Sequence, residues 1–263
     1  MSSEGPVPMV RTEPAGDGIA EIIMNNPPVN ALPAAGWFDV ARQVAAAGGD
    51  PGTRAVILRA EGRGYNAGVD IGEMQRTAGF TALLEVSRGC YEAFRAVYEC
   101  PVPVIAAVHG FCLGGGIGLV GNSDVIIASE DATFGLPEVD RGALGAATHL
   151  SRLVPQHKMR AMVYTAATAT AAELHQFGSV HAVVPREALR AAALEFAGRI
   201  AAKDPVVIRR AKESLNGIDP RDVNRSYRYE QGFTFELNLA GAGDRARDAF
   251  VAGGEHSSAG AAR

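Results

Sequence analysis

Three short runs of almost uniformly apolar residues constrain the fold of this chain more than any other feature. They are RAVILRA at 54–60, VPVIAAV at 102–108 and DVIIAS at 124–129. Each suits a strand that is buried on both faces, and segments with helical spacing precede the first two, at 33–47 and 80–99. Strands that alternate with helices form parallel βαβ units, so the sequence predicts an α/β fold.

The last part of the chain is mainly helical in pattern. Asp204 followed by Pro205 has the form of an N-cap and a first helical residue. We therefore predict a core over residues 1–203 and a C-terminal helical region over 204–252. The final stretch, 253–263, is small, polar and aperiodic, which predicts a disordered tail.

Charge and composition exclude several classes of partner. The 263 residues carry a net charge of -4, which offers no basic field for nucleic acid. No apolar run approaches the roughly 20 residues needed to cross a bilayer, and the first residues lack the pattern of a signal peptide. We expect a cytoplasmic protein without a membrane partner. Three cysteines without a C-x-x-C pair indicate neither a disulfide framework nor a zinc site, so no metal is expected.

Two glycine-bearing loops, each directly after an apolar strand, are candidate ligand sites. They are YNAGVDIGEM at 65–74 and HGFCLGGGIGL at 109–119, and the second opens a helix. Glycines at such junctions let backbone N–H groups point at a ligand, and a helix N-terminus adds partial positive charge. A dinucleotide site is the competing interpretation. It is disfavoured because G-x-G-x-x-G is matched only loosely and Glu138, about 20 positions on, is not at a strand end.

Taken together, these segments resemble the crotonase (enoyl-CoA hydratase/isomerase) superfamily over nearly the whole chain, from 25 to 250. Five family-like blocks occur in order: PPVNAL, RAVILRAEGRGYNAGVDIGEM, CPVPVIAAVHGFCLGGGIGLVGNSDVIIASEDATFGLPEV, LSRLVP and AKESL. The resemblance implies a spiral of βαβ units with a C-terminal helical trimerisation region, assembled as a homotrimer or hexamer. It also implies an acyl-CoA substrate and no cofactor beyond the CoA moiety of that substrate.

The resemblance assigns site residues one by one. Val69 and Gly115 match the two backbone amides that hold the thioester oxygen in an oxyanion hole. In this family CoA is held largely by backbone near PPVNAL and the first loop, which points to Val29, Ala31, Ala67, Asp70 and Ile71. Asp70 could equally cap the helix that begins at IGEMQ.

The acids of this chain depart from the pattern of the hydratases. Those enzymes place one glutamate two residues after GGG and a second in FGxPE, whereas this chain has Gly118 at the first position and Glu138 at the second. Chemistry with a single acid or base is therefore favoured over two-glutamate hydration. Asp140, Arg141 and His149 are the nearby candidates, although a lone histidine on a helix is more often structural.

Four charged residues near the C-terminus are further candidates. Glu230 and Glu236 lie in YEQGFTFELNL, a region that closes over the acyl pocket in relatives, and the apolar surroundings favour Glu236. Solvated surface charge is the simpler interpretation of both. Arg245 and Arg247 could reach the phosphates of CoA.

Within the superfamily, the segments AEGRGYNAGVDIGEMQRT, LVGNSDVIIASEDATFGLPEVDRGALGAATHLSRLVPQH and YEQGFTFELNLAG most resemble the ring-opening CoA hydrolases of actinobacterial steroid catabolism. This implies hydrolysis of a carbon–carbon bond next to a ring ketone, with Glu138, Asp140 or His149 activating water. Gly118 would then leave room for a bicyclic substrate. The alternatives are an enoyl-CoA isomerase or hydratase, and a non-catalytic CoA-binding subunit.

Overall fold

The chain folds around a six-stranded sheet in this computed structural model, which describes residues 8–76 and 80–259. Strand β1 pairs antiparallel with β2, and the further neighbours in the order β2-β3-β4-β6-β9 are parallel. The strands are β1 (Val10–Pro14), β2 (Ile19–Met24), β3 (Ala55–Ala60), β4 (Val104–Val108), β6 (Val125–Ser129) and β9 (Ala182–Val184). The predicted α/β class is confirmed, and β3, β4 and β6 lie on the three apolar runs.

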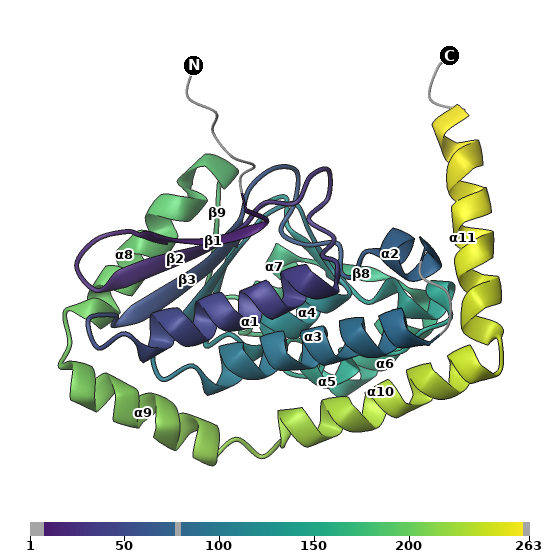
Figure 1. The fold of residues 1–263 in the computed structure, drawn as a ribbon. Coiled ribbons are helices and arrows are strands. Elements are labelled where there is room, and N and C mark those ends of the chain that lie inside the picture. The colour runs from purple at the N-terminus through teal and green to yellow at the C-terminus, as the bar shows by residue number, and fades with distance from the viewer. Residues whose placement is uncertain (1–7, 77–79, 260–263) are drawn as a thin grey trace, which may run out of the picture.

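Helices cover both faces of this sheet, which explains why its central strands are apolar throughout. On β3, Val56 and Leu58 belong to the core shared with α1 and α3, whereas Ala55 and Ile57 pack with α8. Figure 1 shows α1 and α3 in front of the sheet and α8 on its opposite side. These helices are α1 (Ala34–Gly49), α3 (Thr81–Glu99) and α8 (Leu189–Ala201).

A second sheet has three strands in the order β5-β7-β8. They are β5 (Phe111–Leu113), β7 (Thr133–Gly135) and β8 (Thr168–Thr170). The sequence does not predict this sheet, because strands of three residues show no periodicity. The short helices are α2 (Ile71–Arg76), α4 (Gly115–Asn122), η1 (Pro137–Arg141), α5 (Ala147–Leu150), α6 (Gln156–Thr165), α7 (Ala171–Gln176) and η2 (Arg186–Ala188), of which η1 and η2 are 3₁₀ helices.

Three helices follow the core: α9 (Pro205–Gly217), α10 (Val223–Leu239) and α11 (Ala242–Ala259). The predicted N-cap is confirmed, because the Asp204 side chain accepts hydrogen bonds from the N–H groups of Val206 and Val207. In Figure 1, α9 and α10 run along one side of the molecule and α11 rises from the end of α10. Helix α11 packs against α10 and η1.

The predicted disorder over 253–263 stays a prediction. Helix α11 continues through Ala259, and residues 260–263 lie outside the described chain.

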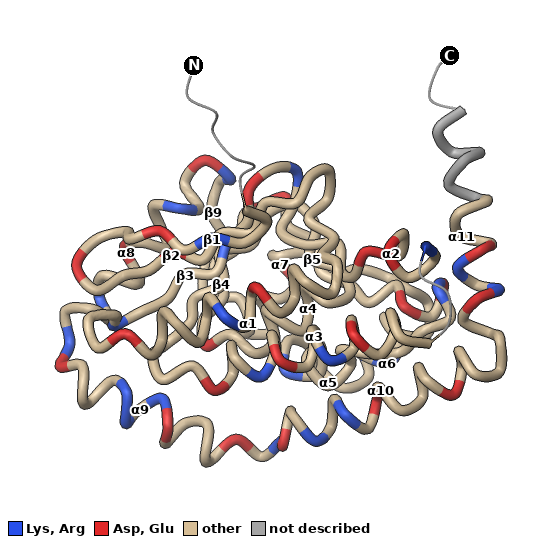
Figure 2. The backbone as a smooth tube through the Cα atoms, viewed as in Figure 1, with Lys and Arg blue, Asp and Glu red and all other residues tan. Residues whose placement is uncertain are grey.

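Charged residues of both signs are mixed along the outer elements (Figure 2). Glu21 of β2 is an exception, because it is fully buried and pairs with Arg59 of β3 at 3.1 Å and with Arg190 of α8 at 2.9 Å. This pair of contacts ties the sheet to α8. Within the described ranges, the helices include none that is long and apolar enough to cross a membrane.

Candidate active site

The two glycine loops meet next to the second sheet. The first loop is fixed by two isolated bridges, Leu32 with Val69 and Asn66 with Cys112. Leu32 donates its N–H to the carbonyl of Gly68 at 2.9 Å. Because these contacts hold the first loop against β5, the loop lies beside the turn that opens α4.

At the meeting point the two backbones approach closely. Gly68 has φ of +91°, and a Cβ placed on it would lie 3.3 Å from the nitrogen of Gly115. Gly115 is the first residue of α4, so its N–H has no partner within the helix. Neither this N–H nor that of Val69 donates to a backbone carbonyl of residues 8–76 and 80–259. The two amides therefore remain available to an anionic oxygen.

Glu138 lies directly beside these amides. Gly114 has φ of +57°, and a Cβ on it would lie 2.7 Å from Oε1 of Glu138, so a side chain at 114 would displace the carboxyl group. Oε2 of Glu138 is buried and has no hydrogen-bond partner within the described chain. Burial raises the pKa of Glu138 to about 8, and the nearby Arg141 opposes this rise. A carboxyl group with such a pKa suits proton transfer near neutral pH.

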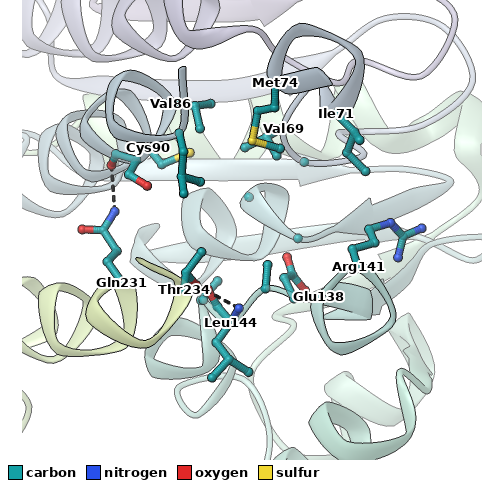
Figure 3. A pocket seen from close by; sticks show the side chains of 18 of the residues that line it. Val69, Ile71, Met74, Val86, Cys90, Glu138, Arg141, Leu144, Gln231 and Thr234 are labelled. Carbon is teal, nitrogen blue, oxygen red and sulfur yellow. Dashed lines mark hydrogen bonds between the residues drawn. The ribbon is translucent and has the colours of Figure 1, made fainter. Parts of the chain in front are cut away.

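A cavity opens in front of Glu138 and the two loops (Figure 3). Its wall is largely apolar, with a few polar groups that are mostly held by hydrogen bonds. Gln231 donates to the carbonyl of Ser87 at 2.7 Å, and the hydroxyl of Thr234 accepts from the N–H of Leu144 at 2.9 Å. The lining comprises Ala67, Gly68, Val69, Ile71, Met74, Leu83, Val86, Ser87, Cys90, Phe94, Gly114, Gly115, Pro137, Glu138, Arg141, Ala143, Leu144, Gly145, Ala146, Tyr227, Gln231, Thr234 and Arg247. Glu138 is thus the single carboxylate among the described residues that line it.

The sequence profile of the family described as "Enoyl-CoA hydratase/isomerase" matches residues 14–236 of this chain. The chain belongs to this family. The predicted superfamily is thereby confirmed.

Two curated relatives share most of the sequence of this family member. One, from Mycobacterium tuberculosis, is 69% identical over 245 residues, which cover 93% of this chain and 99% of the relative. The other, from Rhodococcus jostii, is 65% identical over 240 residues, covering 91% and 93%. Both bear the name (7aS)-7a-methyl-1,5-dioxo-2,3,5,6,7,7a-hexahydro-1H-indene-carboxyl-CoA hydrolase.

Solved structures of the family share the fold. A crystal structure of an enoyl-CoA hydratase/isomerase from Xanthobacter autotrophicus Py2 matches with a TM-score of 0.83 at 30% identity, covering 92% of this chain and 91% of that one. A probable enoyl-CoA hydratase from Mycobacterium thermoresistibile matches with a TM-score of 0.79 at 28% identity, covering 88% of this chain and 96% of that one. The predicted crotonase-type core is confirmed by these neighbours.

Among the residues predicted to bind CoA in this crotonase, Ala67 and Ile71 line the cavity. Val29 lies next to them, because its carbonyl accepts the N–H of Ala67 at 3.2 Å, and the carbonyl of Ala31 accepts from Asn26 at 2.6 Å. Asp70 accepts hydrogen bonds from Gly72 and Glu73, at 2.8 and 3.3 Å, at the start of α2. Its carboxylate thus has the capping role that the sequence left open.

The other two candidate bases are not brought to the cavity. Asp140 is exposed on the outer side of η1. His149 is 1% exposed and lies behind the wall, with its ring 5.0 Å from the rings of both Phe94 and Tyr227. Its Nδ1 has no partner within the described chain, and burial lowers the pKa of His149 to about 3. A histidine that stays neutral behind two aromatic rings is placed for packing.

The absence of a side chain at Gly118 is explained by the neighbouring ring of Phe94. A Cβ on Gly118 would lie 2.2 Å from Cζ of Phe94, so the ring of Phe94 occupies the space of a side chain at 118. Gly118 itself is not among the residues that line the cavity, so any room that it leaves for substrate would come through the position of the Phe94 ring. Phe94 lines the cavity in its place.

Helix α10 supplies site residues that the sequence analysis missed. Tyr227, Gln231 and Thr234 follow helical spacing and all line the cavity. Glu236, the favoured acid of this helix, is exposed, whereas Glu230 accepts the N–H of Ala147 at 2.9 Å. The stripe at i, i+4 and i+7 is the signal that would have found them.

The arginines of α11 also differ from each other. Arg245 is exposed, whereas Arg247 is 9% exposed and lines the cavity. The guanidinium group of Arg247 donates to the side chains of Asn238 at 2.7 Å and Asp244 at 2.5 Å.

Among the described residues there is no group of three or more His, Cys, Asp or Glu side chains that could hold a metal ion.

Proposed function

We propose that this enzyme hydrolyses a carbon–carbon bond next to a ring ketone in a bicyclic CoA thioester, as part of bacterial steroid ring degradation. The observation that carries the proposal is a single carboxylate, Glu138, beside two available backbone amides. Gly118 stands at the position of the other hydratase glutamate, and Phe94 fills its space. The two relatives at 69% and 65% identity, whose names specify a dioxo-hexahydroindene-carboxyl-CoA substrate and hydrolysis, support the same reaction.

The proposed reaction begins with water. Ionised Glu138 takes a proton from a water molecule, whose oxygen bonds to the ketone carbon. The carbon–carbon bond breaks, and its electron pair is delocalised through the conjugated ring onto the thioester oxygen, which accepts hydrogen bonds from the amides of Val69 and Gly115. The proton on Glu138 then passes to the carbanion. The product has gained one water, and the only cofactor chemistry is that of the CoA moiety of the substrate.

CoA is proposed to bind along the first loop. Its contacts are proposed to be chiefly with backbone groups. The residues proposed for this role are Val29, Ala31, Ala67, Asp70 and Ile71.

The test is a panel of three thioesters: crotonyl-CoA, a 3-enoyl-CoA and a bicyclic keto thioester, each incubated in ¹⁸O-water. Ring opening predicts a mass gain of one water on the keto thioester with the label in the new carboxylate. An enoyl-CoA isomerase, which also needs one carboxylate, would convert the 3-enoyl-CoA without label. Hydration of crotonyl-CoA as the main activity, or binding without turnover of any ester, would overturn the proposal.

We also propose that the chain assembles as a homotrimer or hexamer through the helical region that begins at 204. Four large apolar side chains are exposed on or next to α9: Val206, Val207, Leu215 and Ile218. Apolar side chains gathered in this way are typical of contact surfaces. Light scattering should give the mass of three or six chains, whereas the mass of one or two chains would contradict this assembly.

A further inference from the structure

Opening the ring creates a second negative charge, and this inference rests on the proposed function. When water adds to the ketone, the ketone oxygen becomes an oxyanion, and after bond cleavage it belongs to a carboxylate. The amides of Val69 and Gly115 are engaged by the thioester oxygen at the other end of the conjugated system. The ketone oxygen therefore needs a donor of its own, close to the group that delivers water.

Arg141 is placed to be that donor. Glu138 and Arg141 stand three residues apart in the 3₁₀ helix η1, and side chains at this spacing in a 3₁₀ helix lie on the same side. Both line the cavity. In Figure 3 the two side chains rise from the same segment, with the carboxyl group of Glu138 on the left and the guanidinium group of Arg141 extended to the right. A ring ketone that lies between the two side chains could meet water from Glu138 and the guanidinium group of Arg141.

The guanidinium of Arg141 is held but not neutralised. One N–H donates to the carbonyl of Pro137 at 2.9 Å, and the group lies 4.2 Å from the ring centroid of Phe250. Within the side chains of residues 8–76 and 80–252, Arg141 forms no ion pair. Arg247, the other arginine of the cavity, is paired with Asp244. Arg141 keeps N–H groups and a full positive charge for an anion.

We propose that Arg141 binds the oxygen of the attacked ketone, first as the tetrahedral oxyanion and then as the new carboxylate. The water oxygen forms its bond to the ketone carbon while Glu138 accepts the water proton and the carbonyl π pair moves to the oxygen at Arg141. Collapse restores the carbonyl, breaks the ring bond and sends that electron pair to the thioester enolate. The bound carboxylic acid passes its proton to solvent water, and the resulting carboxylate remains paired with Arg141 until the product leaves.

The first experiment compares Arg141→Gln with Arg160→Gln, an exposed arginine on α6 that serves as a matched loss of charge. Loss of one oxyanion donor typically lowers kcat about 10² to 10³-fold, so Arg141→Gln should fall by this factor on the bicyclic keto thioester and Arg160→Gln should stay within about threefold. The affinity of both variants for crotonyl-CoA, which has no ring ketone, should match that of the unchanged protein. Free CoA should also inhibit all three proteins equally.

A second readout is independent of turnover. The ring-opened product carries the carboxylate, so its inhibition constant should rise at least about tenfold in Arg141→Gln, as expected for loss of a charge-assisted hydrogen bond. In Arg141→Ala, added guanidinium ion should restore part of kcat, whereas it should not stimulate Arg160→Gln.

Three results would overturn the role of Arg141. One is a kcat within about threefold of the unchanged protein; another is product inhibition that does not change. The third is a parallel loss of crotonyl-CoA or CoA binding, which would assign Arg141 to loop structure or to CoA itself. Failure of the unchanged protein to open the keto thioester would instead reject the proposed function, so the two failures are distinguishable.

Discussion

The two walls of the cavity differ in what they do with polar groups. On the α4 wall, Gly118 faces the ring of Phe94, and His149 is sealed behind it with a neutral ring. On the η1 wall, Glu138 and Arg141 both line the cavity, and these two described side chains form no ion pair with each other. Two-glutamate hydration needs an acid on both walls. Here Gly118 brings no acid to one wall, and the other wall holds a base and a cation, which suits attack by water from one side on a bulky ring.

The largest effect that this contrast predicts is the loss of the base on the η1 wall. Glu138→Gln should lower kcat about 10² to 10⁴-fold, the usual contribution of a general base, while CoA-thioester affinity is retained. Asp140→Asn removes a carboxylate of the same helix that points to solvent and should leave kcat within about twofold. Steady-state kinetics with calorimetric binding checks both. Equal losses in the two variants would mean that the contrast between the walls has no bearing on catalysis.

The pH dependence sharpens the same point. The base must be ionised to accept a proton from water, and the pKa of Glu138 is raised to about 8 in the folded protein. Activity should therefore rise about tenfold per pH unit below 8 and level off above it. The measurement is a profile of kcat/KM between pH 5.5 and 9.5, at those pH values where the protein remains folded. A profile that falls as pH rises would mean that Glu138 acts as an acid in the protonated form.

These predictions rest on a site of which the sequence revealed only part. The apolar runs predicted β3, β4 and β6, because strands buried on both faces carry that pattern. The glycine loops and Glu138 followed from resemblance. The resemblance also pointed to the α10 segment, but not to the side chains of it that line the cavity. Gln231 meets the carbonyl of Ser87 from 144 positions away, and such a pairing exists only after the helices pack. The role of Gly118 was missed for the same reason, since its neighbour Phe94 comes from α3.

The packing of the α4 wall can be tested through Gly118. In Gly118→Ala the new Cβ meets the ring of Phe94 at 2.2 Å, so overpacking should cost about 1 to 3 kcal/mol of the free energy of unfolding. Gly198 in α8 has open space around its Cα, so Gly198→Ala is the matched control and should stabilise by about 0.4 to 1 kcal/mol. Urea unfolding measures both. Phe94→Leu should relieve the clash in the double variant.

A change at His149 should have only a small effect on activity. In His149→Leu an apolar side chain replaces a neutral ring whose Nδ1 lacks a partner in the described chain, so kcat should stay within about threefold.

The free energy of unfolding, in contrast, should depend on His149 through pH. The pKa of His149 is about 3 in the folded protein against an ordinary 6.5, so its contribution is present above pH 6.5 and is lost as pH falls toward 3. The variant lacks this loss, so its unfolding free energy relative to the unchanged protein should gain about 2 kcal/mol between pH 7 and pH 5. Denaturant unfolding at the two pH values measures the difference. A constant difference would show that His149 is protonated within the fold, and a kcat lowered a hundredfold would bring the α4 wall back into the chemistry.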